Sequence, residues 1–209
     1  MQSPVRLILA IILLLAIPGV GQSTSPLDSA LEDNVYTNFF FRIRYPFSAS
    51  WIPQSVAAVD QIPEATQGCF GTSPAGAPGS GKHSHNLLTL ARNIPGQGLA
   101  GRSRAIIVFK AEELASDSGI SSGQDCAAKL TDHLKKHHFT AVGDVKEVQL
   151  SGISFFRQDF KGTSSAGAPQ YESAFFTVSK GYALGFILSA PNEQMRSLML
   201  ETLSKLKFF

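Results

Sequence analysis

The C-terminal segment, residues 152–209, constrains the fold more than any other part of the chain. It contains three apolar or alternating stretches, ISFFRQDFKG, YESAFFTVS and GYALGFILS, which are typical of β-strands. Gly181 separates the last two stretches and tolerates positive φ, which predicts a tight antiparallel hairpin. Pro191 suits the first position of a helix, and apolar residues follow it at helical spacing: Met195, Leu198, Met199, Leu203 and Leu206. Antiparallel strands with a helix packed across them predict an α+β fold.

The segments before residue 152 add further strands and a second helix. Phe39, Phe41, Ile43 and Tyr45 alternate with other residues, which predicts one long strand over residues 39–45. Pro46 ends that strand because it lacks a backbone donor, and Trp51 is expected to pack on the core from a following turn. Buried strands are predicted at 86–91 and 105–109, a helix at 125–138, and a strand at 145–150. Because no second boundary interrupts this pattern, residues 36–209 are predicted to form a single domain.

The N-terminus has the three parts of a secretory signal peptide. Arg6 supplies a positive charge, residues 7–17 (LILAIILLLAI) are apolar, and Pro18 and small residues follow. The apolar run is shorter than the roughly 20 residues of a membrane span, so we expect cleavage near Gly21-Gln22 rather than a retained anchor. We therefore predict a secreted or periplasmic protein with no membrane span after cleavage. Residues 22–35 are expected to be flexible or to hold a short helix at 29–33.

The charge of the chain excludes one class of partner. Charged residues make up 16% of the sequence, below the roughly 25% of ordinary soluble proteins, and the formal net charge is +2. The basic residues are dispersed along the chain and form no cluster. Nucleic-acid binding is therefore not expected.

The overall order of these segments resembles the PsbP-like superfamily. The resemblance rests on the aromatic segment FFFRIRYPFSASW, the stretch GISFFRQDF, the hairpin at Lys180-Gly181 and the closing LSKLKFF. It covers residues 36–209 and implies an antiparallel sheet sandwiched between helices. The superfamily includes photosystem-associated lumenal proteins, Ran-binding import factors and exported bacterial proteins. It implies a binding role, but no functional residue can be transferred from it, since fold alone does not fix function.

The two cysteines of the chain are Cys69 and Cys126. An even number of cysteines in an exported protein predicts a disulfide, here between a glycine-rich loop and the start of the predicted helix. The alternative is a pair of free thiols. A redox centre is not expected because the sequence contains no C-x-x-C motif.

Two glycine-rich segments approach nucleotide-binding motifs without meeting their requirements. Residues 76–83 (GAPGSGKH) end in His83, where a phosphate-binding loop needs a Ser or Thr hydroxyl for magnesium. Residues 96–101 (GQGLAG) match G-x-G-x-x-G but precede a predicted strand instead of a helix. Both segments are interpreted as connections, and no cofactor is expected.

The histidines are the best candidates for metal ligands. His133 and His137 are four residues apart on the predicted helix, so both imidazoles can reach one ion. His138 is adjacent, and His83 and His85 lie upstream. No H-E-x-x-H motif is present, and a histidine near the C-terminus of a helix is favourable for dipole reasons alone. A metal-dependent enzyme built on His133 and His137 therefore ranks behind the other hypotheses.

The chain contains 15 phenylalanines, several of them adjacent, so both faces of the sheet should be apolar. Helices on both sides would bury them; an incomplete layer would leave a groove or patch formed by Phe39, Phe41, Trp51, Phe155 and Phe175. No G-x-S-x-G elbow or other catalytic motif is present. The leading hypothesis is therefore an exported, non-enzymatic binding or accessory protein of the cell envelope, with an unknown partner and as a monomer. The first alternative is a carrier of a small apolar ligand, which a cavity above about 300 Å³ would favour.

Overall fold

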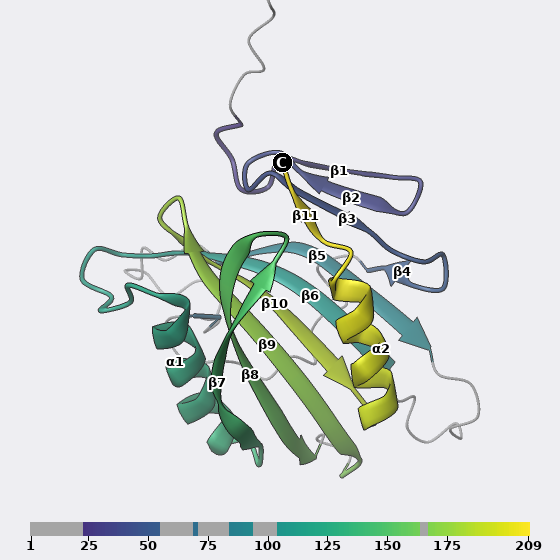
Figure 1. Cartoon of the computed structure of the whole chain (residues 1–209), viewed down its shortest axis with the longest axis vertical. Coiled ribbons are helices and arrows are strands. Elements are labelled where there is room, and N and C mark those ends of the chain that lie inside the picture. Colours follow the sequence, from purple (N-terminus) through teal and green to yellow (C-terminus); the bar gives the residue numbers. More distant parts are fainter. Residues whose placement is uncertain (1–22, 55–68, 71–83, 94–103, 164–166) are drawn as a thin grey trace, which may run out of the picture.

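The computed structural model describes residues 23–54, 69–70, 84–93, 104–163 and 167–209. Two antiparallel sheets and two helices make up this part of the chain (Figure 1). None of the described helices has the length and apolar character needed to cross a membrane. The predicted signal peptide and both glycine-rich motifs lie outside the described residues.

The larger sheet has seven strands in the order β4-β5-β6-β10-β9-β8-β7. Its strands are β4 (Ile52–Pro53), β5 (Ser84–Asn93), β6 (Arg104–Glu113), β7 (Thr140–Leu150), β8 (Ile153–Thr163), β9 (Pro169–Ser179) and β10 (Tyr182–Ala190). The smaller sheet has four strands in the order β1-β2-β3-β11 and lies across one end of the larger sheet (Figure 1). Its strands are β1 (Ser29–Glu32), β2 (Val35–Asn38), β3 (Ile43–Pro46) and β11 (Lys207–Phe208).

The hairpin predicted at Lys180-Gly181 connects β9 and β10 in the structure. Both turn residues have positive φ, 52° and 80°, as the two central residues of a type I′ turn require. The same pattern occurs in the β7–β8 turn at Ser151-Gly152 and in the β1–β2 turn at Asp33-Asn34. These turns twist in the same sense as their strands, which fixes the register of all three hairpins.

One face of the larger sheet is covered by α1 (Gly123–Lys135). Ala127 and Leu130 of α1 belong to a buried cluster with Phe160 and Phe176 of the sheet. The helix can approach closely because its first residue is Gly123. A Cβ at this position would lie 2.2 Å from the carbonyl oxygen of Phe176.

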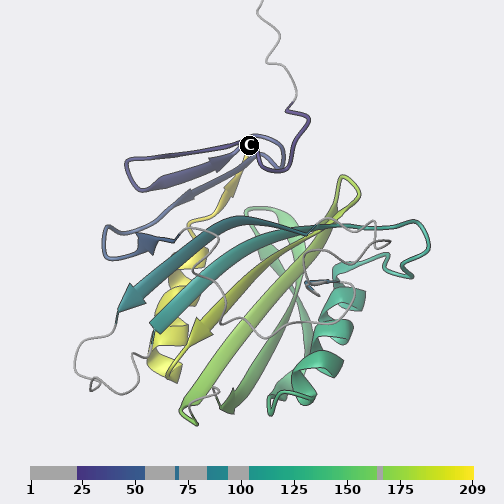
Figure 2. The ribbon, with the colours of Figure 1, turned by 180° about the vertical axis from the view of Figure 1, so that it is seen from behind.

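The opposite face carries α2 (Glu193–Leu203) and the inner side of the smaller sheet. Met199 of α2 is fully buried against the core, and Tyr45 of β3 contacts Phe109 of β6 with 4.9 Å between ring centroids. Seen from behind, β5 and β6 run next to the smaller sheet (Figure 2). Helices were expected on both faces of the sheet. This is correct for the face that α1 covers, whereas the opposite face is covered partly by α2 and partly by strands of the smaller sheet.

The N-terminal region differs from the prediction. Residues 39–45 do not form one strand: residues 39–42 form a turn between β2 and β3. The cause is Asn38, whose Oδ1 accepts the Phe41 N–H at 2.7 Å while its Nδ2 donates to the Pro26 carbonyl at 2.8 Å. Such side-chain bonds to the backbone favour turns over strands. Residues 29–32, predicted to be flexible or helical, form β1 because the Asp33-Asn34 turn folds them back onto β2.

The helix boundaries also differ slightly. The first helix begins at Gly123 instead of residue 125, because Ser122 and Asp125 form a capping box, and it ends at Lys135 instead of residue 138. The last helix begins at Glu193, with Asn192 as N-cap, so Pro191 precedes the helix instead of opening it. The strand predicted at residues 145–150 begins earlier, at Thr140.

Cys69 and Cys126 form a disulfide, as the cysteine count predicted. It attaches Cys69 and Phe70 to the first turns of α1. Phe70 stacks on Phe176 with 5.1 Å between ring centroids, and its N–H donates to Oε2 of the buried Glu112. Both cysteines are almost completely buried. The disulfide therefore holds a short segment against the face of the sheet that α1 covers.

Removing this crosslink should destabilise the fold. For the double variant Cys69→Ala, Cys126→Ala we expect the free energy of unfolding to fall by about 2–4 kcal/mol, since the bond closes a loop with a sequence separation of 57. Urea unfolding followed by circular dichroism measures the change. The unmodified protein in excess reducing agent should behave like the variant; equal stability of the reduced and oxidised proteins would contradict the prediction.

Candidate binding site

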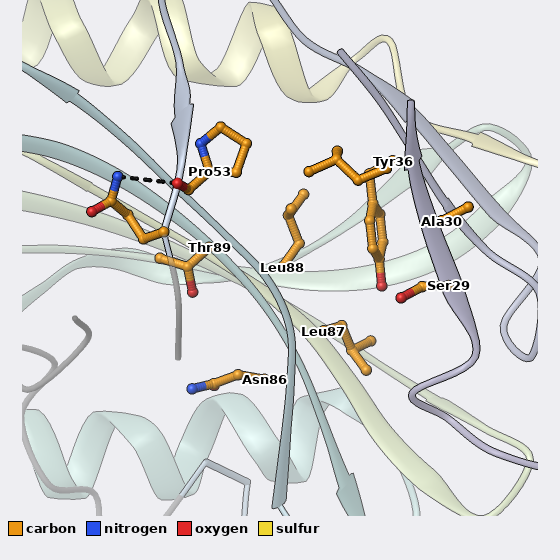
Figure 3. Close-up of a pocket in the computed structure, with 10 residues that line it drawn as sticks. Ser29, Ala30, Tyr36, Pro53, Asn86, Leu87, Leu88 and Thr89 are labelled. Atoms are coloured by element: carbon orange, nitrogen blue, oxygen red, sulfur yellow. Dashed lines mark hydrogen bonds between the residues drawn. The ribbon is translucent and has the colours of Figure 1, made fainter. Parts of the chain in front are cut away.

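A pocket of about 220 Å³ lies where the smaller sheet meets the edge of the larger one (Figure 3). Its walls come from β1, β2, β4 with the residue that follows it, and β5. The lining residues are Ser29, Ala30, Leu31, Tyr36, Pro53, Gln54, Asn86, Leu87, Leu88 and Thr89. The volume is below the roughly 300–1,000 Å³ of typical small-molecule sites, so it does not favour the carrier hypothesis.

Tyr36 is the rigid wall of this pocket. Its ring stands between Leu88 and β1, and its hydroxyl points toward Ser29 (Figure 3). The hydroxyl also accepts a hydrogen bond from Asn38 Nδ2 at 3.2 Å. Burial raises the pKa of Tyr36 above its ordinary value, and the bonds to Asn38 and Ser29 only partly offset this effect. The side chain is therefore a neutral phenol fixed in place, suited to shaping a site.

Exposed apolar residues border the pocket. Leu31, in its wall, is 46% exposed, and Ile52, next to the lining residue Pro53, is 52% exposed. Large apolar side chains at a pocket rim are typical of a surface that binds another protein.

A second exposed group of aromatic residues lies at the turn between β2 and β3. Phe39 is exposed, and Phe209 is held there by its N–H, which donates to the Arg42 carbonyl at 3.0 Å. The Lys180 ammonium lies 4.8 Å from the centroid of the Phe40 ring and donates to the Phe40 carbonyl. These contacts fasten the smaller sheet to the β9–β10 hairpin.

The residues predicted to form an apolar groove or patch are mostly in the core. Only Phe39 is exposed; Phe41, Trp51, Phe155 and Phe175 are at most 5% exposed. The reason is that α2 and the smaller sheet cover the face to which Phe155 and Phe175 belong. The pocket is lined instead by residues that no sequence motif distinguishes. It forms where the smaller sheet meets the edge of the larger one, which depends on the tertiary structure.

The histidine pair lies at the end of α1. His133 and His137 have ring centroids 4.5 Å apart, and His133 is almost completely buried. Burial lowers the pKa of His133, and the charges of His137 and Lys136 lower it further. Within the described residues no group of three or more His, Cys, Asp or Glu side chains is placed to hold a metal ion. His85 is in β5, where its ring contacts Tyr182, and it does not join the pair.

The most concentrated set of charges among the described residues attaches α2 to the sheet. Arg157 donates to both carboxylate oxygens of Asp159, at 2.9 and 2.8 Å, and Ser173 donates to the same carboxylate at 2.6 Å. Arg196 of α2 reaches Asp159 at 3.4 Å and also pairs with Glu193. The Asp159 carboxylate therefore links β8, β9 and α2. No local sequence pattern predicts this network, because Asp159, Ser173 and Arg196 come from three different elements.

Glu172 of β9 is a buried carboxyl group on the face that α1 covers. Its Oε1 accepts a hydrogen bond from Gln170 Nε2 at 3.0 Å, and the same amide donates to Ser189 Oγ at 2.6 Å. Burial raises the pKa of Glu172 to about 7, and the bond from Gln170 offsets only part of the rise. The folded chain therefore favours the protonated carboxyl group.

Glu172 should make the stability depend on pH. Its pKa is higher in the folded chain than in the unfolded one, so stability falls as the pH rises from about 4.5 to 7 and then levels off. In Glu172→Gln this decline should disappear, leaving the variant more stable at pH 8 by up to about 3 kcal/mol. Urea unfolding at pH 5, 6, 7 and 8 measures both effects. The exposed Glu113→Gln is the matched control and should keep the wild-type decline; parallel curves for wild type and Glu172→Gln would refute this role.

Comparison with solved structures identifies the fold. Cyanobacterial PsbP (CyanoP) from Synechocystis sp. PCC 6803 superposes with a TM-score of 0.52 at 12% identity, covering 89% of this chain and 95% of that chain. LpqN of Mycobacterium tuberculosis, described as involved in cell envelope biogenesis, gives a TM-score of 0.44 at 13% identity over 79% of this chain and 82% of that one. No protein-family model and no curated protein sequence matches the chain. The chain has a PsbP-like fold, as the resemblance implied.

Proposed function

We propose that this protein is an exported, non-enzymatic accessory protein of the cell envelope that binds a partner protein at the pocket between β1 and β5. The observation that carries the proposal is the pocket itself, with the exposed Leu31 and Ile52 at its border. A space of about 220 Å³ is too small to enclose a lipid-sized ligand but large enough for one or two side chains of a partner.

Two further observations support this proposal. The apolar residues 7–17 and the buried disulfide both suit a protein that folds outside the cytoplasm. The charge network around Asp159 is engaged in attaching α2 to the sheet. A binding role therefore accounts for the exposed features without invoking catalysis.

Site-specific photo-crosslinking in the producing organism tests the proposal. With p-benzoylphenylalanine at Leu31, or separately at Ile52, we expect ultraviolet light to join the chain to the same single envelope protein. The control position is Val142 in β7, the strand at the opposite edge of the larger sheet, which is 50% exposed. Crosslinked products analysed by mass spectrometry should contain the partner for positions 31 and 52 only. No product at these two positions, or the same products at position 142, would disprove partner binding at the pocket.

A further inference from the structure

β1 is an edge strand of the smaller sheet. Among the described strands it pairs with β2 alone, so one side of β1 has no strand beside it in this part of the chain. The Phe39 N–H donates to the Asp28 carbonyl at 2.9 Å, and the two-residue turn at Asp33-Asn34 makes Glu32 and Val35 a hydrogen-bonded pair. In an antiparallel ladder hydrogen-bonded pairs alternate with non-bonded ones. The backbone N–H and C=O groups of Ala30 and Glu32 therefore point toward β2. Ser29 and Leu31 therefore turn their N–H and C=O groups away from the sheet.

The pocket faces the edges of two strands. Side chains alternate between the faces of a sheet, so a pocket over one face would be lined by every second residue of a strand. Here three consecutive residues of β1, 29–31, line it, and they face residues 86–89 of β5, where a β-bulge between Asn86 and Leu88 interrupts the alternation. The free side of β1 thus lies opposite the edge of β5.

The β5 side of the pocket is only partly paired. β4 reaches Leu90 and Ala91, and the Gln54 N–H donates to the Thr89 carbonyl at 2.9 Å. No strand in the described part of the chain pairs with β5 at residues 84–88 on this side. Oδ1 of Asn86 is also buried and has no hydrogen-bond partner among the described residues. This side therefore offers an acceptor to an incoming donor.

The acidic residues around β1 favour binding of a positively charged segment. Residues 23–38 contain three acidic side chains, Asp28, Glu32 and Asp33, and no Lys, Arg or His. All three are exposed, at the two ends of β1. A second copy of β1 would bring the same charges together, which disfavours edge-to-edge dimerisation. A segment with basic residues at its ends would be attracted instead.

We infer that the pocket binds an extended segment of the partner by strand addition to β1. This inference rests on the proposed function and specifies how the partner is held. The segment would form main-chain hydrogen bonds with Ser29 and Leu31, as in other cases of strand addition. It would place an apolar side chain against Tyr36, Leu87 and Leu88, and carry Lys or Arg at its ends.

Proline substitution separates this mode of binding from others. Leu31→Pro removes an N–H that faces away from β2, so the β1–β2 ladder stays intact, as is common for proline on an edge strand. The matched control Leu31→Val removes a similar amount of apolar contact but keeps the N–H. Thermal unfolding of both variants checks that the fold is retained.

The experiment selects peptides from a random seven-residue phage library on the full mature chain, with counter-selection on Leu31→Pro. We expect enriched peptides with alternating apolar residues and basic ends, measured by fluorescence polarisation. They should bind wild type and Leu31→Val within threefold of each other, and Leu31→Pro about tenfold more weakly, the equivalent of one lost hydrogen bond. Absence of peptides that distinguish wild type from Leu31→Pro would overturn strand addition.

Hydrogen exchange provides a second measurement that does not depend on the variant. Adding a selected peptide to the wild-type chain should slow exchange of the Ser29 and Leu31 amides, and unchanged exchange there would refute the inference. A partner that crosslinks at positions 31 and 52 but binds Leu31→Pro normally would contradict strand addition while leaving the proposed function standing. Absence of any crosslinked partner would instead refute the proposed function.

Discussion

The contacts between aromatic rings across one face of the larger sheet hold this structure together. Phe109 of β6 contacts Tyr45 of the smaller sheet and Phe186 of β10, with ring centroids 4.9 and 4.4 Å apart. Phe186 in turn contacts Phe155 of β8, which contacts Phe208 of β11. Through these rings β3 and β11 of the smaller sheet pack on the larger one. Each pair contributes roughly 0.5–1.5 kcal/mol beyond the burial of its area, so the four together contribute about 2–6 kcal/mol, a substantial fraction of the roughly 5–15 kcal/mol stability of a typical domain.

The candidate site depends on these contacts, although it lies outside them. The pocket exists because Tyr36 and β1 are held beside β5, and Tyr36 is positioned by its own edge-on contact with Phe109, 6.1 Å between centroids. A change that loosened the smaller sheet would therefore open or close the pocket without altering any lining residue. The proposed binding role thus rests on the packing of two sheets and on the free edge of β1, which are properties of the assembled fold.

Much of the larger sheet could be predicted because its signals are local. Alternation in β8 and β10 and the Lys180-Gly181 turn are encoded within a few residues, and all appear in the structure. The smaller sheet could not be predicted in the same way. The run Phe39-Phe40-Phe41 is rich in residues that favour strands, yet Asn38 captures the Phe41 N–H and converts the run into a turn. A single side-chain hydrogen bond prevailed over intrinsic strand preference.

The candidate site shows the same division between local and long-range information. The sequence by itself predicted a disulfide, antiparallel strands and the apolar faces of the sheet, because residue types and short periodic patterns specify them, and the resemblance to the PsbP-like superfamily implied the fold. The α+β expectation is correct only in part, since strands outweigh the two helices in the described residues. It also marked His133 and His137 as neighbours, since helical geometry brings residues four apart together. Only the tertiary structure decided that most of the phenylalanines are buried, that Asp159 gathers charges from β8 and α2, and that β1 faces β5 across a pocket. Those features join residues tens of positions apart, and their proximity depends on how whole sheets pack, which no local pattern encodes.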